Sequence, residues 1–328
     1  MKKRLSFGCA AAMLFAVAAA HAEDSPKPLD VHWNEGAEDC AAHPPPPLQV
    51  HRYDARTFIL RESLCATAEA PFLYLLVGAN RALLIDSGDV AAAKDMPLAR
   101  TVRSLLSDNG ASPPPLLIVH THGHLDHRSG DVQFEGQADA EIVATDLAHV
   151  TQKFGFTDWP QGQAGIDLGG RVVDVLPTPG HYPSHLSFYD RTTGLLFTGD
   201  FLMPGRLLID DAAQDLASAN RLADFARSHP ITHVLGGHIE MQASGETYMP
   251  GVSYHPDEHR LELMQRDALA LPDVVRSFNG LYSRHGIFVM VSQTRMLIVI
   301  GTLAIGVLVL IGAMLTRFLR RRRARRLR

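Results

Sequence analysis

The sequence feature that most constrains this chain is the six-residue run His122-Gly123-His124-Leu125-Asp126-His127. A helix brings side chains onto one face at spacings of three and four residues, whereas this run places them at a spacing of two. The apolar residues 115–119 directly before it are typical of a short buried strand. We therefore expect three imidazoles and one carboxylate in a loop at the end of a core strand.

Imidazole and carboxylate groups gathered in one loop indicate a metal site. Together these donors suit zinc, iron or manganese. A chance gathering of surface histidines is the alternative, and further potential ligands elsewhere in the chain argue against it.

Three later segments repeat one pattern, in which a strand ends in a short turn that contains a glycine and one potential ligand. The turns are 178–181, 198–200 and 236–238, and their ligands are His181, Asp200 and His238. Asp86 likewise follows an apolar strand. Glycine beside a ligand lets the backbone bend sharply and approach a site closely. The combination predicts one site assembled from several strand ends.

In order and approximate spacing, these motifs resemble the metallo-β-lactamase superfamily over roughly residues 50–245. The resemblance implies an α+β fold, a four-layer αββα sandwich with the metal site at one edge of the paired sheets. Asp200 makes the chain more similar to glyoxalase II-like and lactonase-like members than to true β-lactamases, which lack an aspartate at that place.

The resemblance also implies a role for each motif residue. His122, His124 and His181 would hold one metal, and Asp200 would bridge both metals. The second metal would be held by Asp126, His127 and His238. Asp86 would orient the ligand loops by hydrogen bonds. Asp126 and Asp200 are the predicted catalytic residues.

The predicted function is a metal-dependent hydrolase with two zinc ions per chain, or alternatively iron or manganese. A metal-bridging hydroxide would attack a small ester, thioester, lactone or amide. Two alternatives stay open, namely an oxidoreductase of the sulfur dioxygenase type with one iron, and a β-lactamase. The sequence specifies neither the substrate nor an oligomeric state.

Both ends of the chain carry membrane signals. Residues 1–22 resemble a secretory signal peptide, and residues 23–47 form a polar, proline-rich leader. Residues 48–290 are the expected catalytic domain. Residues 296–316 carry no charge and are long enough to span a bilayer, and the arginine-rich residues 317–328 follow. The sequence predicts a single-pass protein of the inner (cytoplasmic) membrane, with its domain facing the periplasm or exterior.

The net charge of −4 conceals an uneven distribution. Lys2, Lys3, Arg4 and the eight arginines of residues 317–328 belong to the two ends. Without them, 20 basic residues face 35 acidic ones, so the domain carries a net charge of −15. Such a domain repels phosphate backbones, which argues against nucleic acid as a partner and leaves a small-molecule substrate and the membrane.

Two cysteines, Cys40 and Cys65, lie beyond the expected signal peptide. An oxidising compartment favours a disulfide between them, and two free thiols are the alternative. Strand-like apolar runs predict successive antiparallel strands between residues 57 and 86 and further strands up to residue 235. Helical periodicity marks residues 92–108, and residues 213–228 and 257–271 also suit helices.

Overall fold

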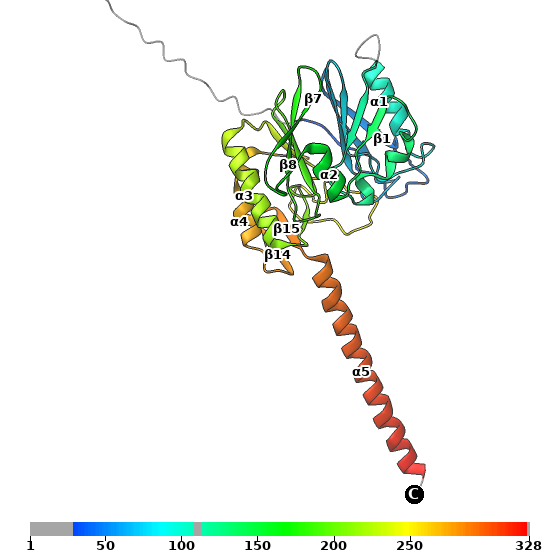
Figure 1. The fold of residues 1–328 in the computed structure, drawn as a ribbon. Helices are drawn as coiled ribbons and strands as arrows, with labels where there is room; N and C mark the ends of the chain where they lie inside the picture. The colour runs from blue at the N-terminus through cyan, green and yellow to red at the C-terminus, as the bar shows by residue number, and fades with distance from the viewer. Residues whose placement is uncertain (1–28, 108–112, 327–328) are drawn as a thin grey trace, which may run out of the picture.

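The computed structural model describes residues 29–107 and 113–326 (Figure 1). The expected signal peptide, residues 1–22, lies outside the described residues. Two six-stranded sheets form the centre of the domain. The first sheet runs in the order β1 (Leu48–Asp54), β2 (Thr57–Glu62), β3 (Phe72–Val77), β4 (Ala82–Ile85), β5 (Leu116–Val119) and β6 (Ala140–Ile142).

The second sheet mixes parallel and antiparallel neighbours. Its order is β13 (Glu262–Leu263), β12 (His233–Gly236), β10 (Leu195–Gly199), β9 (Leu186–Asp190), β8 (Val172–Pro177) and β7 (Ala164–Asp167). A small third sheet contains β11 (Arg206–Leu208), β15 (Phe288–Val291) and β14 (Tyr282–His285). The helices are α1 (Leu98–Ser107), α2 (Leu147–Phe154), α3 (Ala212–Ser228), α4 (Gln265–Arg276) and α5 (Gln293–Arg326).

Strand β3 shows why the first sheet is buried on both faces. Phe72 and Tyr74 point into the core between the two large sheets, where Tyr74 packs against Phe197 of β10. The alternate residues Leu73 and Leu75 point into the core beneath α1. Side chains alternate along a strand, so a strand that is apolar on both faces must be covered on both.

Helices cover the outer faces of both large sheets. Helix α1 packs Leu98, Val102 and Leu106 on the outer face of the first sheet. Helices α3 and α4 pack together and cover the outer face of the second sheet. The layers therefore run helix, sheet, sheet, helix, which confirms the expected αββα sandwich.

Two expected helices have different bounds in the structure. The helix expected over 92–108 begins at Leu98, because Pro97 suits the first turn of a helix and residues 92–96 form a turn. The helix expected over 257–271 is α4, Gln265–Arg276, since residues 262–263 pair with β12 as strand β13. Tertiary pairing outweighs local helical periodicity there.

The described part of the leader, residues 29–47, has little regular structure but packs against the domain. Trp33 is 5% exposed, and its ring lies 4.9 Å from that of Phe72. A disulfide joins Cys40 to Cys65, with 5.4 Å between the two Cα atoms. This part of the leader thus forms one folded body with the domain.

Helix α5 leaves the domain directly after β15 and extends well away from it (Figure 1). Residues Gln293–Arg323 are long and apolar enough to cross a membrane, and none of the tested window is buried against the protein. The helix is therefore a candidate membrane span. It begins three residues before the expected segment 296–316 and continues through the arginines as far as Arg326.

Candidate metal centre

The predicted ligands meet because several strands end at the same edge of the sandwich. Strand β4 runs parallel to β5, and β10 runs parallel to β12. Strand β8 has the same direction as β10, because both pair antiparallel with β9. The loops that follow these five strands therefore lie together at one edge, as the strand-end pattern predicts.

The first group of donors consists of three histidines. His124 Nδ1 lies 2.9 Å from His122 Nε2 and 3.1 Å from His181 Nε2, and the last two atoms are 3.2 Å apart. Nitrogen ligands about 2.0–2.1 Å from a tetrahedral zinc ion stand about 3.4 Å from one another. Three nitrogens at these separations can hold one metal ion.

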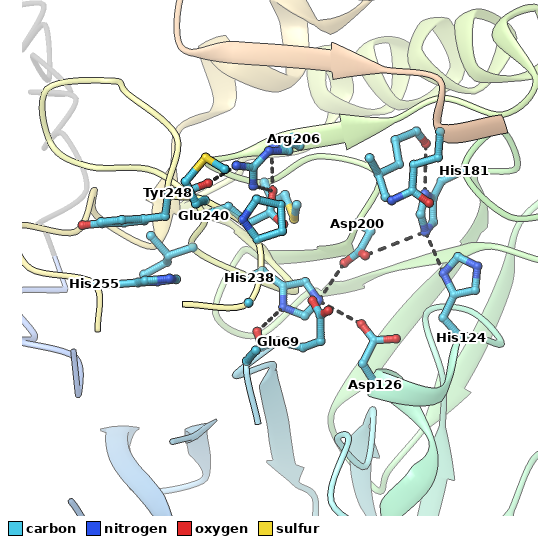
Figure 2. A pocket seen from close by; sticks show the side chains of 18 of the residues that line it. Glu69, His124, Asp126, His181, Asp200, Arg206, His238, Glu240, Tyr248 and His255 are labelled. Atoms are coloured by element: carbon cyan, nitrogen blue, oxygen red, sulfur yellow. Dashed lines mark hydrogen bonds and ion pairs between the residues drawn. The ribbon is translucent and has the colours of Figure 1, made fainter. Parts of the chain in front are cut away.

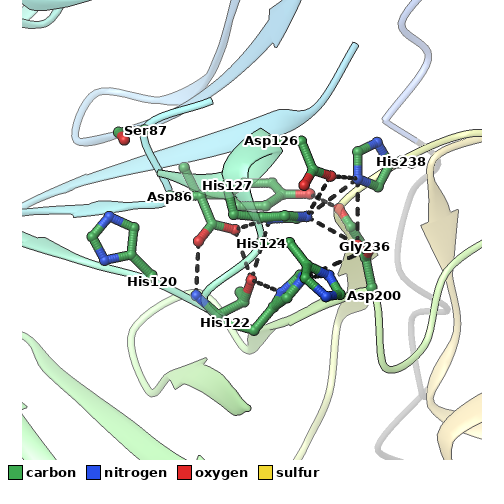
Figure 3. Close-up of polar contacts among 12 residues, drawn as sticks. Asp86, Ser87, His120, His122, His124, Asp126, His127, Asp200, Gly236 and His238 are labelled. Carbon is green, nitrogen blue, oxygen red and sulfur yellow. Dashed lines mark hydrogen bonds and ion pairs between the residues drawn. The ribbon is translucent and has the colours of Figure 1, made fainter. Parts of the chain in front are cut away.

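The second group combines two histidines with two carboxylates. Asp126 Oδ2 lies 3.2 Å from His127 Nε2 and 3.3 Å from His238 Nε2 (Figure 3). Asp200 completes a set of four donors that all lie within 4.8 Å of one another. The set can hold a second metal ion.

Asp200 connects the two groups, because each of its oxygens faces one of them. Its Oδ2 atom lies 3.7 Å from His181 Nε2 and 4.0 Å from His122 Nε2. Its Oδ1 atom lies 3.3 Å from His127 Nε2 and 3.4 Å from His238 Nε2. This buried Oδ1 atom accepts no hydrogen bond of normal geometry from the described residues, which fits an oxygen placed to bind a cation.

Backbone carbonyls fix the ring states of two of these histidines. His181 Nδ1 donates to the Leu208 carbonyl at 2.9 Å, and His238 Nδ1 donates to the Glu69 carbonyl at 2.7 Å. A neutral imidazole that donates from Nδ1 has a lone pair on Nε2. In both residues Nε2 faces the site, where its lone pair can bind a cation when the ring is neutral.

Asp86 and Thr121 orient two further histidines. Asp86 accepts hydrogen bonds from the Thr121 amide at 2.7 Å, from the Thr121 hydroxyl at 2.9 Å and from His127 Nδ1 at 2.9 Å. Because the Thr121 hydroxyl donates to Asp86, its oxygen accepts from His122 Nδ1 at 3.1 Å. Both rings thus present Nε2 to the site, as metal-ligating histidines commonly do.

The two groups differ in charge. Burial and the neighbouring imidazoles hold the pKa of His122 well below its usual value, so this ring is neutral. Burial opposes protonation of His238 as well, but Asp200 and Asp126 overcome it and raise the pKa of His238 to about 10. The carboxylates thus attract a proton that a divalent cation would displace on binding.

The structure brings all seven predicted ligands and Asp86 together. Sequence reasoning missed Thr121 and the carbonyls of Glu69 and Leu208. Thr121 stands beside the histidine run, whereas a backbone carbonyl gives no signal in the sequence. Tyr182, directly after His181, has its ring 5.0 Å from that of His124.

A glycine lets the last ligand loop approach the site. A Cβ atom on Gly237 would lie 2.5 Å from Asp200 Oδ1 and 2.9 Å from His127 Cε1. Such contacts are closer than carbon atoms tolerate, so a side chain at this position would push the loop away. The glycine beside His238 is thus a requirement of the site.

A cavity of about 490 Å³ opens over the two groups of donors, within the range of small-molecule sites (Figure 2). Predicted ligands from both groups line it. Figure 2 places Arg206, Glu240 and Tyr248 on the other side of Asp200 from His124 and His181. His255 is buried and also lines the cavity.

Comparison with known proteins identifies the family. The family model described as "Metallo-beta-lactamase superfamily" matches residues 66–238, which is more than half of the chain and contains all the predicted ligands. The chain belongs to the metallo-beta-lactamase superfamily. The family and the curated relatives confirm the predicted class, a metallo-hydrolase of this superfamily.

Two curated relatives illustrate the range of similarity. The chain is 25% identical to "Acyl-coenzyme A thioesterase MBLAC2" of Gallus gallus over 231 residues, 60% of this chain and 82% of that protein. It is 33% identical to "Hydroxyacylglutathione hydrolase" of Dechloromonas aromatica (strain RCB) over 155 residues, 46% of this chain. The match spans about half (52%) of the length of that hydrolase.

Among solved structures, "Metallo-beta-lactamase from Pontibacter korlensis" aligns with a TM-score of 0.48 and 16% identity. The alignment covers 70% of this chain and 100% of that one.

Replacing Asp86 with alanine is expected to lower both zinc affinity and kcat by about 10- to 100-fold, because His127 and Thr121 lose the acceptor that orients them. Zinc affinity is measured by competition with a chromophoric chelator. The matched control is Asp174→Ala, which removes the partner of Arg191 and changes a buried aspartate outside both donor groups. Equal affinities in the two variants would contradict the role of Asp86.

Asp215 is a buried carboxyl behind the His181 loop, where a Cβ atom on Gly180 would lie 2.5 Å from its Oδ1. Burial, followed by the nearby Asp211, raises the pKa of Asp215 to about 8. A raised pKa in the folded state gives stability that is complete below pH of about 4 and is lost as the pH rises through about 8.

The unmodified chain is expected to lose a few kcal/mol of unfolding free energy between pH 5 and pH 9 as Asp215 ionises. Asp215→Asn removes this loss, so its Tm is expected to fall less over the same pH range. Tm is measured on the full chain across that range. The control is Asp224→Asn, which changes an exposed carboxylate of the same helix. If Tm fell equally with pH in Asp215→Asn and in the unmodified chain, Asp215 would be ionised over the whole range from pH 5 to pH 9.

Proposed function

We propose that this protein hydrolyses acyl thioesters or esters with two bound metal ions, and that both ions are zinc. His122, His124 and His181 would hold one ion. Asp126, His127 and His238 would hold the other, and Asp200 would bind both. The observation that supports this most is the position of Asp200, whose two oxygens each face a complete group of donors.

A bound pair of ions would supply an activated water near neutral pH and would polarise the acyl carbonyl. The protein supplies the rest of the chemistry. Asp126 and Asp200 would place negative charge beside the reacting water, and Asp86 holds the His127 ring with Nε2 toward the site. The cavity leaves one side of the two groups open for the acyl group.

The relatives favour thioesters among the candidate substrates. The names of both relatives describe enzymes that cleave a thioester. A β-lactamase activity is less consistent with Asp200, because the true β-lactamases of this superfamily, as the sequence resemblance implies, lack an aspartate at that position. We therefore expect thioesters to be better substrates than esters, lactones and amides.

The proposed location is the inner membrane, with α5 as a single span. The arginines that follow residue 316 would lie in the cytoplasm, and the domain would face the periplasm. Protease added to intact spheroplasts is expected to remove the domain and leave α5 with its tail. Protection of the domain in spheroplasts, with cleavage in inverted vesicles, would reverse the orientation.

The deciding experiment is elemental analysis of the full chain, purified in detergent without chelator or added metal, together with assays on thioester, ester, lactone and β-lactam substrates. Two zinc ions per chain and fastest turnover of thioesters are expected. One iron per chain with oxygen consumption would instead establish a dioxygenase. Fastest turnover of a chromogenic cephalosporin would establish a β-lactamase.

A further inference from the structure

The cavity over the donor groups reaches the first residue of the candidate membrane span. Gln293, with which α5 begins, lines the same cavity as His124, His181 and Asp200. If α5 spans a bilayer as proposed, residue 293 lies at the bilayer surface. The cavity then lies next to that surface.

A hydrogen-bonded sheet holds the cavity in this position. The Leu208 carbonyl, which accepts from His181 Nδ1, belongs to β11, and Leu208 pairs with Val291 of the parallel strand β15. One residue, Ser292, separates β15 from α5, and its amide donates to the Leu281 carbonyl at 3.0 Å. A predicted metal ligand and the start of the span are thus linked through one short strand pair.

The lining of the cavity includes exposed apolar side chains. Outside α5, the described residues include six large apolar side chains that are more than a third exposed. Two of the six, Leu125 at 62% and Met249 at 74%, line this cavity. Exposed apolar groups beside a binding site mark a place where an apolar ligand or a membrane is met.

The charges of the cavity disfavour an anionic leaving group. Arg206 is the one lysine or arginine among the described residues that line it, and Glu240 already pairs with it at 3.3 Å. Arg206 also donates to the Tyr248 carbonyl. Glu69 adds a further acidic group. Recognition of phosphates or several carboxylates generally requires free cationic side chains, which this lining does not supply.

We propose that the substrate is a membrane-partitioned acyl thioester or ester whose leaving group carries no net negative charge. The acyl chain would contact Leu125 and Met249 while the carbonyl reaches the donor groups. Water adds to the acyl carbon, the C–S or C–O bond breaks, and the thiol or alcohol departs with a proton. The proposal rests on the proposed hydrolase function, and it differs from the coenzyme A and glutathione thioesters that the relatives' names describe.

The test uses the full chain in phosphatidylcholine vesicles with three probes, namely S-palmitoyl-N-acetylcysteamine, S-acetyl-N-acetylcysteamine and palmitoyl-coenzyme A. We expect kcat/KM for the neutral palmitoyl thioester to exceed that of each of the other two by at least about tenfold. Equal or faster turnover of either other probe would overturn this substrate class and leave the hydrolase function intact. No turnover of any probe would instead count against the thioesterase itself.

A variant tests the role of the membrane position. Ten glycine and serine residues inserted after Met296 leave Gln293 and the bond from Arg295 to the Gly280 carbonyl in place. Residues 297–316 still suffice to span the bilayer. The control carries the same insertion after Arg320, beyond the span.

The measured quantity is the palmitoyl-to-acetyl ratio of kcat/KM, which is insensitive to the fraction of folded enzyme. The insertion after Met296 is expected to lower this ratio by at least about tenfold, because it moves the cavity away from the bilayer. The control insertion is expected to leave the ratio unchanged. An unchanged ratio in the Met296 variant would overturn the proposal that the substrate enters from the membrane surface.

Discussion

Asp200→Asn is expected to lower kcat for a thioester substrate by about 1,000-fold and to reduce the bound zinc from two ions per chain to one or fewer. Its two oxygens face both donor groups, whereas an asparagine amide presents a nitrogen that cannot bind a cation. A loss of about 4 kcal/mol in transition-state stabilisation corresponds to this fall in rate. Both quantities are measured on the same preparation, by steady-state kinetics and elemental analysis.

The matched control for this variant is Asp174→Asn. Asp174 is likewise a buried aspartate, on strand β8, but its partner is Arg191 and it lies in neither donor group. We expect the control to retain two zinc ions and nearly full kcat. If Asp200→Asn kept kcat within tenfold of the unmodified enzyme, the assignment of Asp200 to both metals would be wrong.

Arg171→Met is expected to lower the free energy of unfolding by about 3–5 kcal/mol, because it leaves the buried carboxylate of Asp190 without its charged partner. Arg171 Nη2 lies 2.6 Å from Asp190 Oδ2, and the two side chains are 5% and 0% exposed. The guanidinium also donates to the Thr57 hydroxyl at 2.8 Å and to the Arg56 carbonyl at 2.8 Å. Arg171 therefore joins the two sheets as well as neutralising Asp190.

The midpoint of urea unfolding of the full chain in detergent measures this loss. The control is Arg81→Met, which removes a partly exposed ion pair with Glu141 and is expected to cost less than about 1 kcal/mol. A loss below about 1 kcal/mol for Arg171→Met would mean that water or another group compensates Asp190.

Much of the candidate site was predictable because its ligands are side chains in short local motifs. His122, His124, Asp126 and His127 lie within six residues, and their residue types alone indicate a metal. The glycine turns before His181 and His238 were recognisable for the same reason. The strands were recognisable from short apolar runs, as in β3, where every residue is buried.

Other parts of the molecule carried no such signal. The small sheet of β11, β14 and β15 was not predicted, because its short strands are stabilised by pairing between distant segments and by packing of Leu207, Phe288 and Met290 into the core beneath α3 and α4. The start of α4 was misplaced, since pairing of β13 with β12 is a contact between distant residues. The carbonyls of Leu208 and Glu69 were missed because every residue has one, whatever its type.

The sequence by itself determined the chemistry that is available to this protein: the donor types, the strands that carry them and an apolar segment long enough to span a membrane. Only the tertiary structure decided that each oxygen of Asp200 faces one group of histidines, which ring nitrogens point inward and that Gln293 lines the cavity. The physical reason is that residue type fixes what a side chain can bind. Which atoms meet depends on the pairing of strands far apart in the chain and on backbone groups common to all residues.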